Sequence, residues 1–241
     1  METNATVGII CRPDHETFGP VADRLRDRGY LVEFLDPGVA LPSTTLDRLD
    51  LLVNKKIRWE SLDALAYAYR NGIAAWNGYV ATALFVNRLS QRAALEAAGF
   101  RTPEPLTEPP DGAYVARSFF DVRSQPCLNG EGDVYERLLD TDRVDRKYYA
   151  VNDGREVRAA VVRFRSKLFG EREYLGPAEV DDAVVERIGR LLRFAGARAL
   201  GVDVVHADGR PYAVDVNPAT SFRRTGLEDA LADSIADAVP S

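Results

Sequence analysis

Short apolar runs alternate with amphipathic segments over the first third of the chain. The runs are rich in β-branched residues and predict buried strands, and the segments between them have apolar residues at helical spacing. The strand–helix–strand order predicts βαβ units around a parallel sheet. No Gly-x-Gly-x-x-Gly follows the first run, so the dinucleotide-binding fingerprint is absent. The expected strands cover 6–11, 30–35, 51–53 and 73–76, and the expected helices cover 18–28 and 61–70.

The rest of the chain begins with a long helical pattern and continues as strands separated by turn signals. Residues 79–99 have the spacing of one long helix, and the prolines that follow end it. Residues 107–112, rich in Pro, are the strongest linker candidate. Two hairpins are expected, with turns at 152–154 and 207–210. The expected strands are 113–116, 148–151, 157–163, 199–205 and 212–216, and the expected helices are 180–194 and 227–238.

The composition is that of a globular protein, with 46% hydrophobic and 28% charged residues. A formal net charge of −6 argues against binding nucleic acid through bulk charge. No apolar run is long enough for a membrane span, and the N-terminus lacks the pattern of a signal peptide. Cys11 and Cys127 have no Cys or His neighbours at metal-ligand spacing. We therefore expect a reduced, cytoplasmic protein with no nucleic-acid or membrane partner.

Lysine is scarce in this chain. Four lysines, Lys55, Lys56, Lys147 and Lys167, stand against 27 arginines. Genomic base composition can cause such a skew, so it predicts no function by itself. Because a lysine offers a compact ammonium that an arginine cannot replace, each of the four is a residue to inspect.

Three oxygen-bearing side chains fall on the second expected hairpin. Asp203 is on its first strand, and Asp215 and Asn217 are two residues apart on its second strand, so these two point to one face. Buried carboxylates repel each other and lose hydration unless a cation compensates. Oxygen ligands without Cys or His suit Mg²⁺. The alternative is that these residues face solvent, as most acidic residues do.

Gly201-Val-Asp-Val-Val205 and Tyr212-Ala-Val-Asp-Val-Asn-Pro218 resemble the metal-binding end of the ATP-grasp superfamily. There, a Gly-x-Asp strand, a Gly-containing turn and a strand ending in Glu/Asp-x-Asn bind the magnesium ions that hold ATP. The resemblance implies these roles for Asp203, Asp215 and Asn217, with Mn²⁺ as an alternative metal. It also implies an ATP-grasp fold with α/β and α+β parts, preceded by a parallel α/β domain.

The upstream sequence is similar to the RimK-like ligases of this superfamily. Glu136-Arg-Leu-Leu139 resembles the hinge that contacts adenine, and Asp145-Arg-Lys147, a Gly turn and a strand reaching Arg163 follow in the family's order. Lys147 and Arg163 would contact an ATP phosphate or the acyl phosphate, which need positive donors. The alternative for both is a solvated strand residue. The implied nucleotide-binding residues are Arg117, Glu136, Arg137, Leu138, Leu139, Asp145 and Lys147, and the implied catalytic residues are Lys147 and Arg163.

The central part departs from the family pattern. A strand ending in Lys and a Gly-rich phosphate loop are usual there, but here Arg117 is the nearest cation, and only 18 residues separate it from Glu136. Residues 129–132 are either a reduced phosphate loop or a turn, and we favour the turn. Residues 217–226, at and after the end of the expected metal-binding strand, resemble the family's loop that faces the acceptor substrate. Arg223 and Arg224 in this segment would bind a carboxylate; the alternative is that they are plain surface residues.

The resemblance implies an ATP- and Mg²⁺-dependent ligase that joins a carboxylate to an amine through an acyl phosphate. Its partners would be small-molecule carboxylates and amines, with a peptide or protein terminus as an alternative, and a homo-oligomer is left open. Two other functions stay open: a small-molecule kinase on the same fold, and a non-catalytic nucleotide-binding protein that has lost the loop. The expected domains are 1–77 (α/β), 78–112 (connecting helix and linker) and 113–241 (nucleotide- and metal-binding region).

Overall fold

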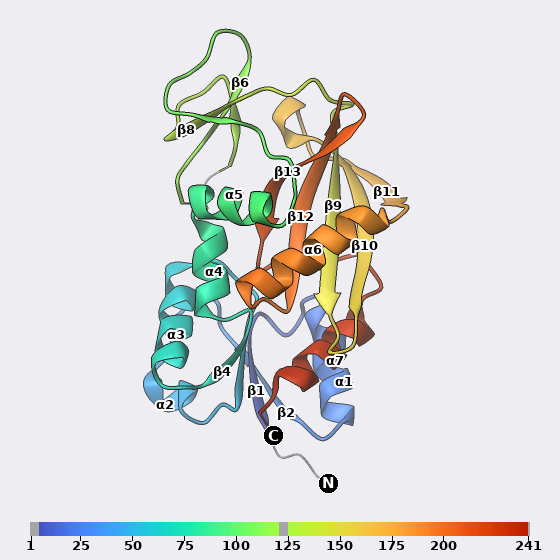
Figure 1. Cartoon of the computed structure of the whole chain (residues 1–241). Helices are drawn as coiled ribbons and strands as arrows, with labels where there is room; N and C mark the ends of the chain where they lie inside the picture. Colours follow the sequence, from blue (N-terminus) through green and yellow to red (C-terminus); the bar gives the residue numbers. More distant parts are fainter. Residues whose placement is uncertain (1–4, 121–124, 241) are drawn as a thin grey trace.

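The computed structural model describes residues 5–120 and 125–240, and it contains three sheets that follow one another along the molecule (Figure 1). The first sheet is parallel with the strand order β2-β1-β3-β4, which confirms the expected βαβ arrangement. Its strands are β1 (Thr6–Ile10), β2 (Leu31–Leu35), β3 (Leu51–Asn54) and β4 (Ala74–Trp76), and its helices are α1 (Phe18–Asp27), α2 (Ser43–Leu46) and α3 (Trp59–Arg70).

The single helix expected over 79–99 is wrong. The chain forms α4 (Tyr79–Val86) and α5 (Arg88–Ala97), which run in different directions (Figure 1). Asn87 between them has an extended backbone, and its side chain accepts hydrogen bonds from the backbone N–H groups of Leu89 and Ser90. Because an extended residue cannot continue a helix, this N-cap turns the chain and starts a second helix at Arg88.

The second sheet has five antiparallel strands in the order β11-β10-β9-β12-β13. On β9 the side chains alternate: Tyr148 and Ala150 belong to the core beneath α6, whereas Lys147 and Tyr149 line a cavity on the other face. The two expected hairpins are confirmed. The elements are β9 (Val144–Asn152), β10 (Val157–Arg165), a 3-10 turn (Lys167–Phe169), β11 (Tyr174–Ala178), α6 (Asp182–Ala195), β12 (Ala199–Ala207) and β13 (Arg210–Asn217).

The third sheet is small, with the antiparallel order β5-β8-β6-β7. Its strands are β5 (Pro105–Leu106), β6 (Tyr114–Arg117), β7 (Cys127–Leu128) and β8 (Val134–Arg137). Residues 129–132, the segment for which we favoured a turn, connect β7 to β8 across β6. A Cβ at Gly132 would lie only 2.7 Å from the carbonyl oxygen of Arg117, so this crossing requires glycine.

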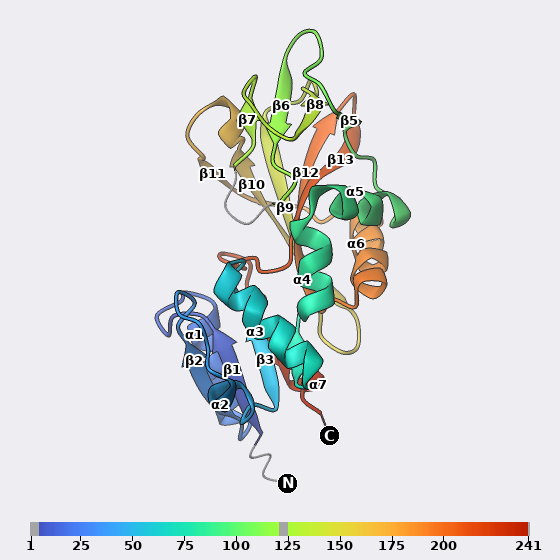
Figure 2. The same ribbon diagram turned by 90° about the vertical axis from the view of Figure 1, so that its left-hand side faces the viewer.

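The last helix, α7 (Glu228–Ala238), returns to the first sheet (Figure 2). Leu231 and Ile235 join Phe18 of α1 in one buried apolar cluster, and Trp76 Nε1 donates a hydrogen bond to Ser234 Oγ at 3.0 Å. The end of the region expected as nucleotide- and metal-binding thus packs against the N-terminal sheet, and the expected domain boundaries stay a prediction.

No helix in the described ranges is both long and apolar enough to cross a membrane. Neither cysteine is in a disulfide: Cys11 is buried directly after β1, and Cys127 is exposed at the start of β7 in a different sheet.

Candidate functional site

A cavity of about 460 Å³ has walls from the five-stranded sheet, the small sheet and the segment that follows β3 of the first sheet. Its lining comes from the segment after β3, from β6 and β8, and from β9, β12 and β13. All four lysines of the chain line it, whereas only four of the 26 arginines within the described residues do. The described wall carries eight cationic and four anionic side chains, although the whole chain has a net charge of −6. Such a local excess of positive charge attracts polyanions.

The β12–β13 hairpin supplies the acidic part of the wall. Asp203 and Asp215 are paired across the hairpin, and Asn217 follows two residues later on the same face. Each carboxylate has a cation beside it. Lys147 Nζ lies 2.9 Å from Asp203 Oδ1, and Arg88 Nη1 donates to Asp215 Oδ1 at 2.9 Å. The structure therefore brings together Asp203, Asp215 and Asn217, the three residues that the sequence predicted for metal binding. Lys147 lies beside them.

These charge pairs set the protonation states on the hairpin. Burial alone would raise the pKa of the Asp215 carboxyl, but the charges of Arg88, Arg117 and Lys147 hold that pKa below its ordinary value. Burial alone would lower the pKa of the Lys147 ammonium, but Asp203 and Asp215 raise that pKa above its ordinary value. Asp215 is thus a carboxylate and Lys147 an ammonium at neutral pH.

The carboxyl group of Asp145 has a pKa above its ordinary value. Asp145 lies on β9 two residues before Lys147, and it lines the same cavity. Burial raises the pKa of its carboxyl, and the negative charge of Asp203 raises it further, while a hydrogen bond with Ser166 works in the opposite direction.

The donor set of the hairpin fits a magnesium ion. Two carboxylates and one amide are the hard oxygen ligands that Mg²⁺ prefers. Asp203 Oδ1 is buried and faces the Lys147 ammonium at 2.9 Å, so a metal bound by Asp203 would share this carboxylate with Lys147. Asn217 Oδ1 accepts from the N–H of Ala219 at 2.8 Å, which orients the amide. No group of three or more His, Cys, Asp or Glu within 5–120 and 125–240 is arranged around a metal position, so an ion here would also need phosphate or water oxygens.

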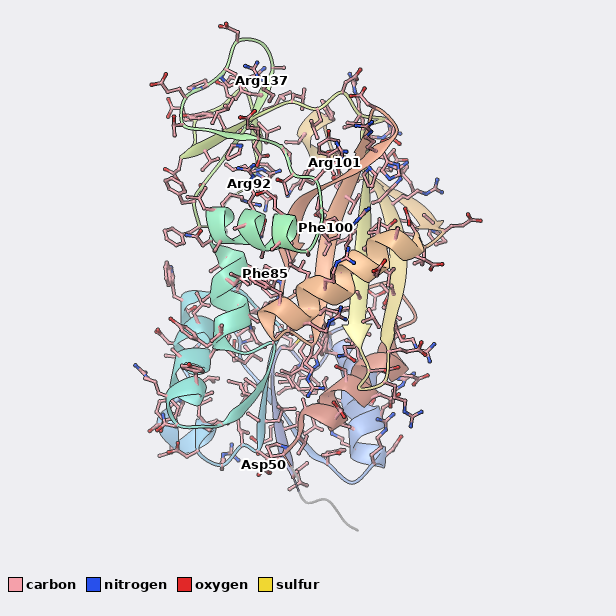
Figure 3. All side chains as sticks on the ribbon, viewed as in Figure 1. Asp50, Phe85, Arg92, Phe100, Arg101 and Arg137 are labelled. Atoms are coloured by element: carbon pink, nitrogen blue, oxygen red, sulfur yellow. The ribbon has the colours of Figure 1, made fainter. Side chains whose placement is uncertain are left out.

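On the opposite wall, Arg117 of β6 and Glu136 of β8 form a buried ion pair. Arg117 Nε donates to Glu136 Oε2 at 2.8 Å, and each side chain is less than a tenth exposed. In Figure 3, Arg137 lies in this small sheet, whereas Phe85 of α4 lies between its helix and the five-stranded sheet. The other expected hinge residues, Arg137, Leu138 and Leu139, also line the cavity, as does Phe85.

Three expected site residues lie outside the cavity. Arg163 on β10 is exposed, and its register partner on β9 is Arg146, not Lys147. Its side chain therefore lies on the face of the sheet opposite to that of Lys147. Arg223 is exposed, with its Nε 3.5 Å from Glu16 Oε2. Arg224 is also exposed, with its guanidinium 4.3 Å from the centre of the Tyr174 ring. The structure does not bring Arg163 to the side of the sheet that lines the cavity.

Within the described residues, five cations that line the cavity were not predicted as site residues: Lys55, Lys56, Arg88, Lys167 and Arg172. Arg88 is buried at the first position of α5, where it donates to Gln91 Oε1 at 2.7 Å as well as to Asp215. The signal that could have found it is the cap at Asn87, which fixes where α5 begins. Lys55 was noted only as one of four lysines, and no sequence pattern indicates that it is buried beside the cavity.

No protein-family model matches the chain, and no curated protein matches it either. Solved structures do match. A RimK domain protein ATP-grasp from Sphaerobacter thermophilus has a TM-score of 0.74 at 16% identity, covering 98% of this chain and 100% of that one. N5-carboxyaminoimidazole synthetase from Staphylococcus aureus has a TM-score of 0.72 at 16% identity, covering 99% of this chain and 78% of that one.

The ATP-grasp ligase PsnB, complexed with a phosphomimetic variant of its minimal precursor, Mg and ADP, has a TM-score of 0.69 at 17% identity and full coverage of both chains. All three similarities span almost the whole of this chain at low sequence identity. The chain therefore has the ATP-grasp fold, which confirms the fold expected from the sequence.

Proposed function

We propose that the protein is an ATP-dependent ligase that joins a carboxylate to an amine through an acyl phosphate. The observation that carries this proposal is the cavity itself, where an excess of cations surrounds two paired aspartates and an asparagine. Cations on the walls would bind the phosphates of a nucleotide, and the acidic hairpin would bind the metal that accompanies them. The fold supports the same conclusion, because the similar solved structures include ligases.

ATP and Mg²⁺ are the cofactors that these residues suit. The PsnB structure contains Mg and ADP, which supports the same pair here. Asp203, Asp215 and Asn217 would hold the metal, which when bound would neutralise charge on the phosphates. Leu138 and Leu139, which follow β8 on the cavity wall, would contact the adenine ring. Arg137 and Asp145 complete the expected nucleotide-binding set on this wall.

The proposed reaction has two steps. A carboxylate oxygen of the substrate attacks the γ-phosphorus of ATP, the bond to the β,γ-bridging oxygen breaks, and ADP leaves. The amine nitrogen of the second substrate then attacks the acyl carbon, inorganic phosphate leaves, and the nitrogen loses a proton. Lys147 would stabilise the transferred phosphoryl group, because its pKa is raised and it stays charged. No nucleophilic side chain is required, since this chemistry rests on positioning and charge.

The substrates belong to the same proposal. Several similar structures contain peptides: PsnB is complexed with its minimal precursor, and the macrocyclase MdnC from Microcystis aeruginosa is bound with its precursor peptide. A peptide is therefore a reasonable carboxylate or amine partner alongside small molecules. Arg223 and Arg224, which lie outside the cavity, are proposed to contact the part of a substrate that extends beyond it.

One feature favours a second candidate, a non-catalytic nucleotide-binding protein. The strand that usually ends in Lys carries Arg117, and Glu136 already pairs with that side chain. ADP release decides between the candidates. A ligase releases ADP over many turnovers only when both a carboxylate and an amine are present, because the amine must consume the acyl phosphate. A kinase needs no amine and leaves a stable phosphorylated product. Absence of ADP release across amino acids, small dicarboxylates and peptides would favour the non-catalytic candidate.

A further inference from the structure

Lys55 occupies a buried position between the first sheet and the loop after β13. It directly follows β3, and only 4% of its surface is exposed. Its Nζ donates a hydrogen bond to the carbonyl oxygen of Ala219 at 2.6 Å and lies 5.6 Å from the centre of the Phe18 ring. A lysine ammonium can donate three hydrogen bonds, so one carbonyl does not satisfy this one.

Three cations and one thiol act on the charge of Lys55. Burial lowers the pKa of Lys55 to about 7, with the positive charges of Lys56, Lys147 and Arg223 acting in the same direction and Cys11 acting against them. Burial also raises the pKa of the Cys11 thiol, which disfavours the thiolate that would be an anionic partner. No described carboxylate forms an ion pair with Lys55, and Glu16 is paired with Arg223. A buried cation without an anionic partner is unfavourable, so an anion bound here would relieve the repulsion.

The loop that accepts this hydrogen bond is packed close to the proposed phosphate site. A Cβ at Gly201 would lie 2.8 Å from Thr220 Oγ1 and 3.0 Å from Lys147 Cε, so only glycine lets the loop and the lysine approach β12 together. Lys55, Lys147 and Thr220 all line the one cavity. The cavity therefore contains two buried ammonium groups on different elements, one beside the acidic hairpin and the other on the side of the first sheet.

We propose that Lys55 anchors a second, non-reacting carboxylate of the substrate, so that the carboxylate substrate is a dicarboxylate or an acidic amino acid. This inference rests on the proposed function, which places the reacting carboxylate beside Lys147 and the metal ligands. Lys55 then selects among substrates through its charge, and its flanking neighbour Lys56 adds to the positive potential of this subsite.

The test is a carboxylate titration monitored by the melting temperature, Tm. The full chain, with and without saturating Mg·ADP, is titrated with acetate, malonate, succinate and glutarate as probes. We expect at least one dicarboxylate to stabilise the protein at a concentration about tenfold lower than acetate does. Lys55→Gln retains a donor for the Ala219 carbonyl but removes the charge, and we expect it to abolish this preference. Lys55→Met, which also removes the donor, should behave in the same way.

The matched control is Arg70→Gln, which removes an exposed cation at the end of α3 and should keep the preference. A wild type without preference for any dicarboxylate, or a Lys55→Gln variant that keeps the preference, would overturn the proposal. So would a Lys55→Gln variant that weakens Mg·ATP but not Mg·ADP, because the anion would then be the γ-phosphate. Failure of the proposed function is separate, since it would show as no Tm response of the wild type to either nucleotide.

Discussion

The five-stranded sheet and the small sheet form opposite walls of one cavity but are built very differently. The five-stranded sheet has strands of up to nine residues and a continuous apolar core beneath α6. The small sheet has two strands of only two residues, and its buried Val115 and Val134 belong to none of the three apolar clusters of the described chain. The first wall therefore derives its stability from packing, and the second depends on a few local contacts.

The charged side chains that line the cavity also differ between the two sheets. The large sheet carries Lys147 and the acidic hairpin on a rigid support, which suits the metal- and phosphate-binding roles proposed for these groups. The small sheet carries one buried ion pair, Arg117 with Glu136, where the fold family usually has a lysine. We infer that the large sheet sets the chemistry and that the small sheet sets nucleotide affinity.

The largest effect is expected from shortening a valine in the large sheet. Val202 on β12 is fully buried in the main core, so Val202→Ala should lower the free energy of unfolding by about 2–4 kcal/mol, from lost transfer energy plus a cavity. Val134→Ala on β8 makes the same chemical change and should cost only about 1 kcal/mol, because its surroundings can relax. Denaturant unfolding of both variants measures the difference. Equal losses would contradict the contrast between the sheets.

A smaller effect, confined to nucleotide binding, is expected from Glu136→Gln. The change removes the charge that holds the Arg117 guanidinium at the cavity wall, so the affinity for Mg·ATP should fall about tenfold, or about 1.4 kcal/mol. Calorimetric titration measures it. Glu131→Gln, an exposed residue in the connection before β8, is the matched control and should bind as the wild type does. Unchanged affinity in Glu136→Gln would mean that the small sheet does not set nucleotide binding.

The large sheet was readable from the sequence because its signals are regular. Alternating apolar residues and a turn whose two central residues, Asp208 and Gly209, have positive φ defined the β12–β13 hairpin. Asp203 on its first strand, with Asp215 and Asn217 two residues apart on its second strand, defined the three oxygen donors. Of the small sheet, the sequence predicted only the strand at 113–116, which corresponds to β6 (Tyr114–Arg117). The two-residue strands β5 and β7 were not predicted, since a strand of that length has no periodicity. Arg163 was assigned to the phosphates from the resemblance to the RimK-like ligases. The face on which it lies depends on the register of β10 against β9, and that register cannot be read from one strand alone.

The break between α4 and α5 was not predicted. Its signal is the polar capping residue Asn87, but the apolar pattern continues across it and favoured one helix.

The burial of charged side chains could not be predicted from the sequence either. Lys55 and Arg88 are charged residues in ordinary local sequence, and only tertiary packing makes them part of the cavity. The scarcity of lysine was the one sequence feature that pointed to Lys55, and all four lysines do line the cavity.

The central claim is that the acidic hairpin binds a metal–nucleotide complex, and the Tm shift caused by Mg·ATP tests it most directly. At a concentration one hundred times its Kd, the ligand should stabilise the wild type by about 2.7 kcal/mol. Combining Asp215→Ala with Asn217→Ala should abolish the shift relative to that variant's own baseline, whereas Glu179→Ala, which removes an exposed carboxylate, should keep it. A wild type that shows no shift, or a double variant that keeps the full shift, would contradict nucleotide binding at this hairpin.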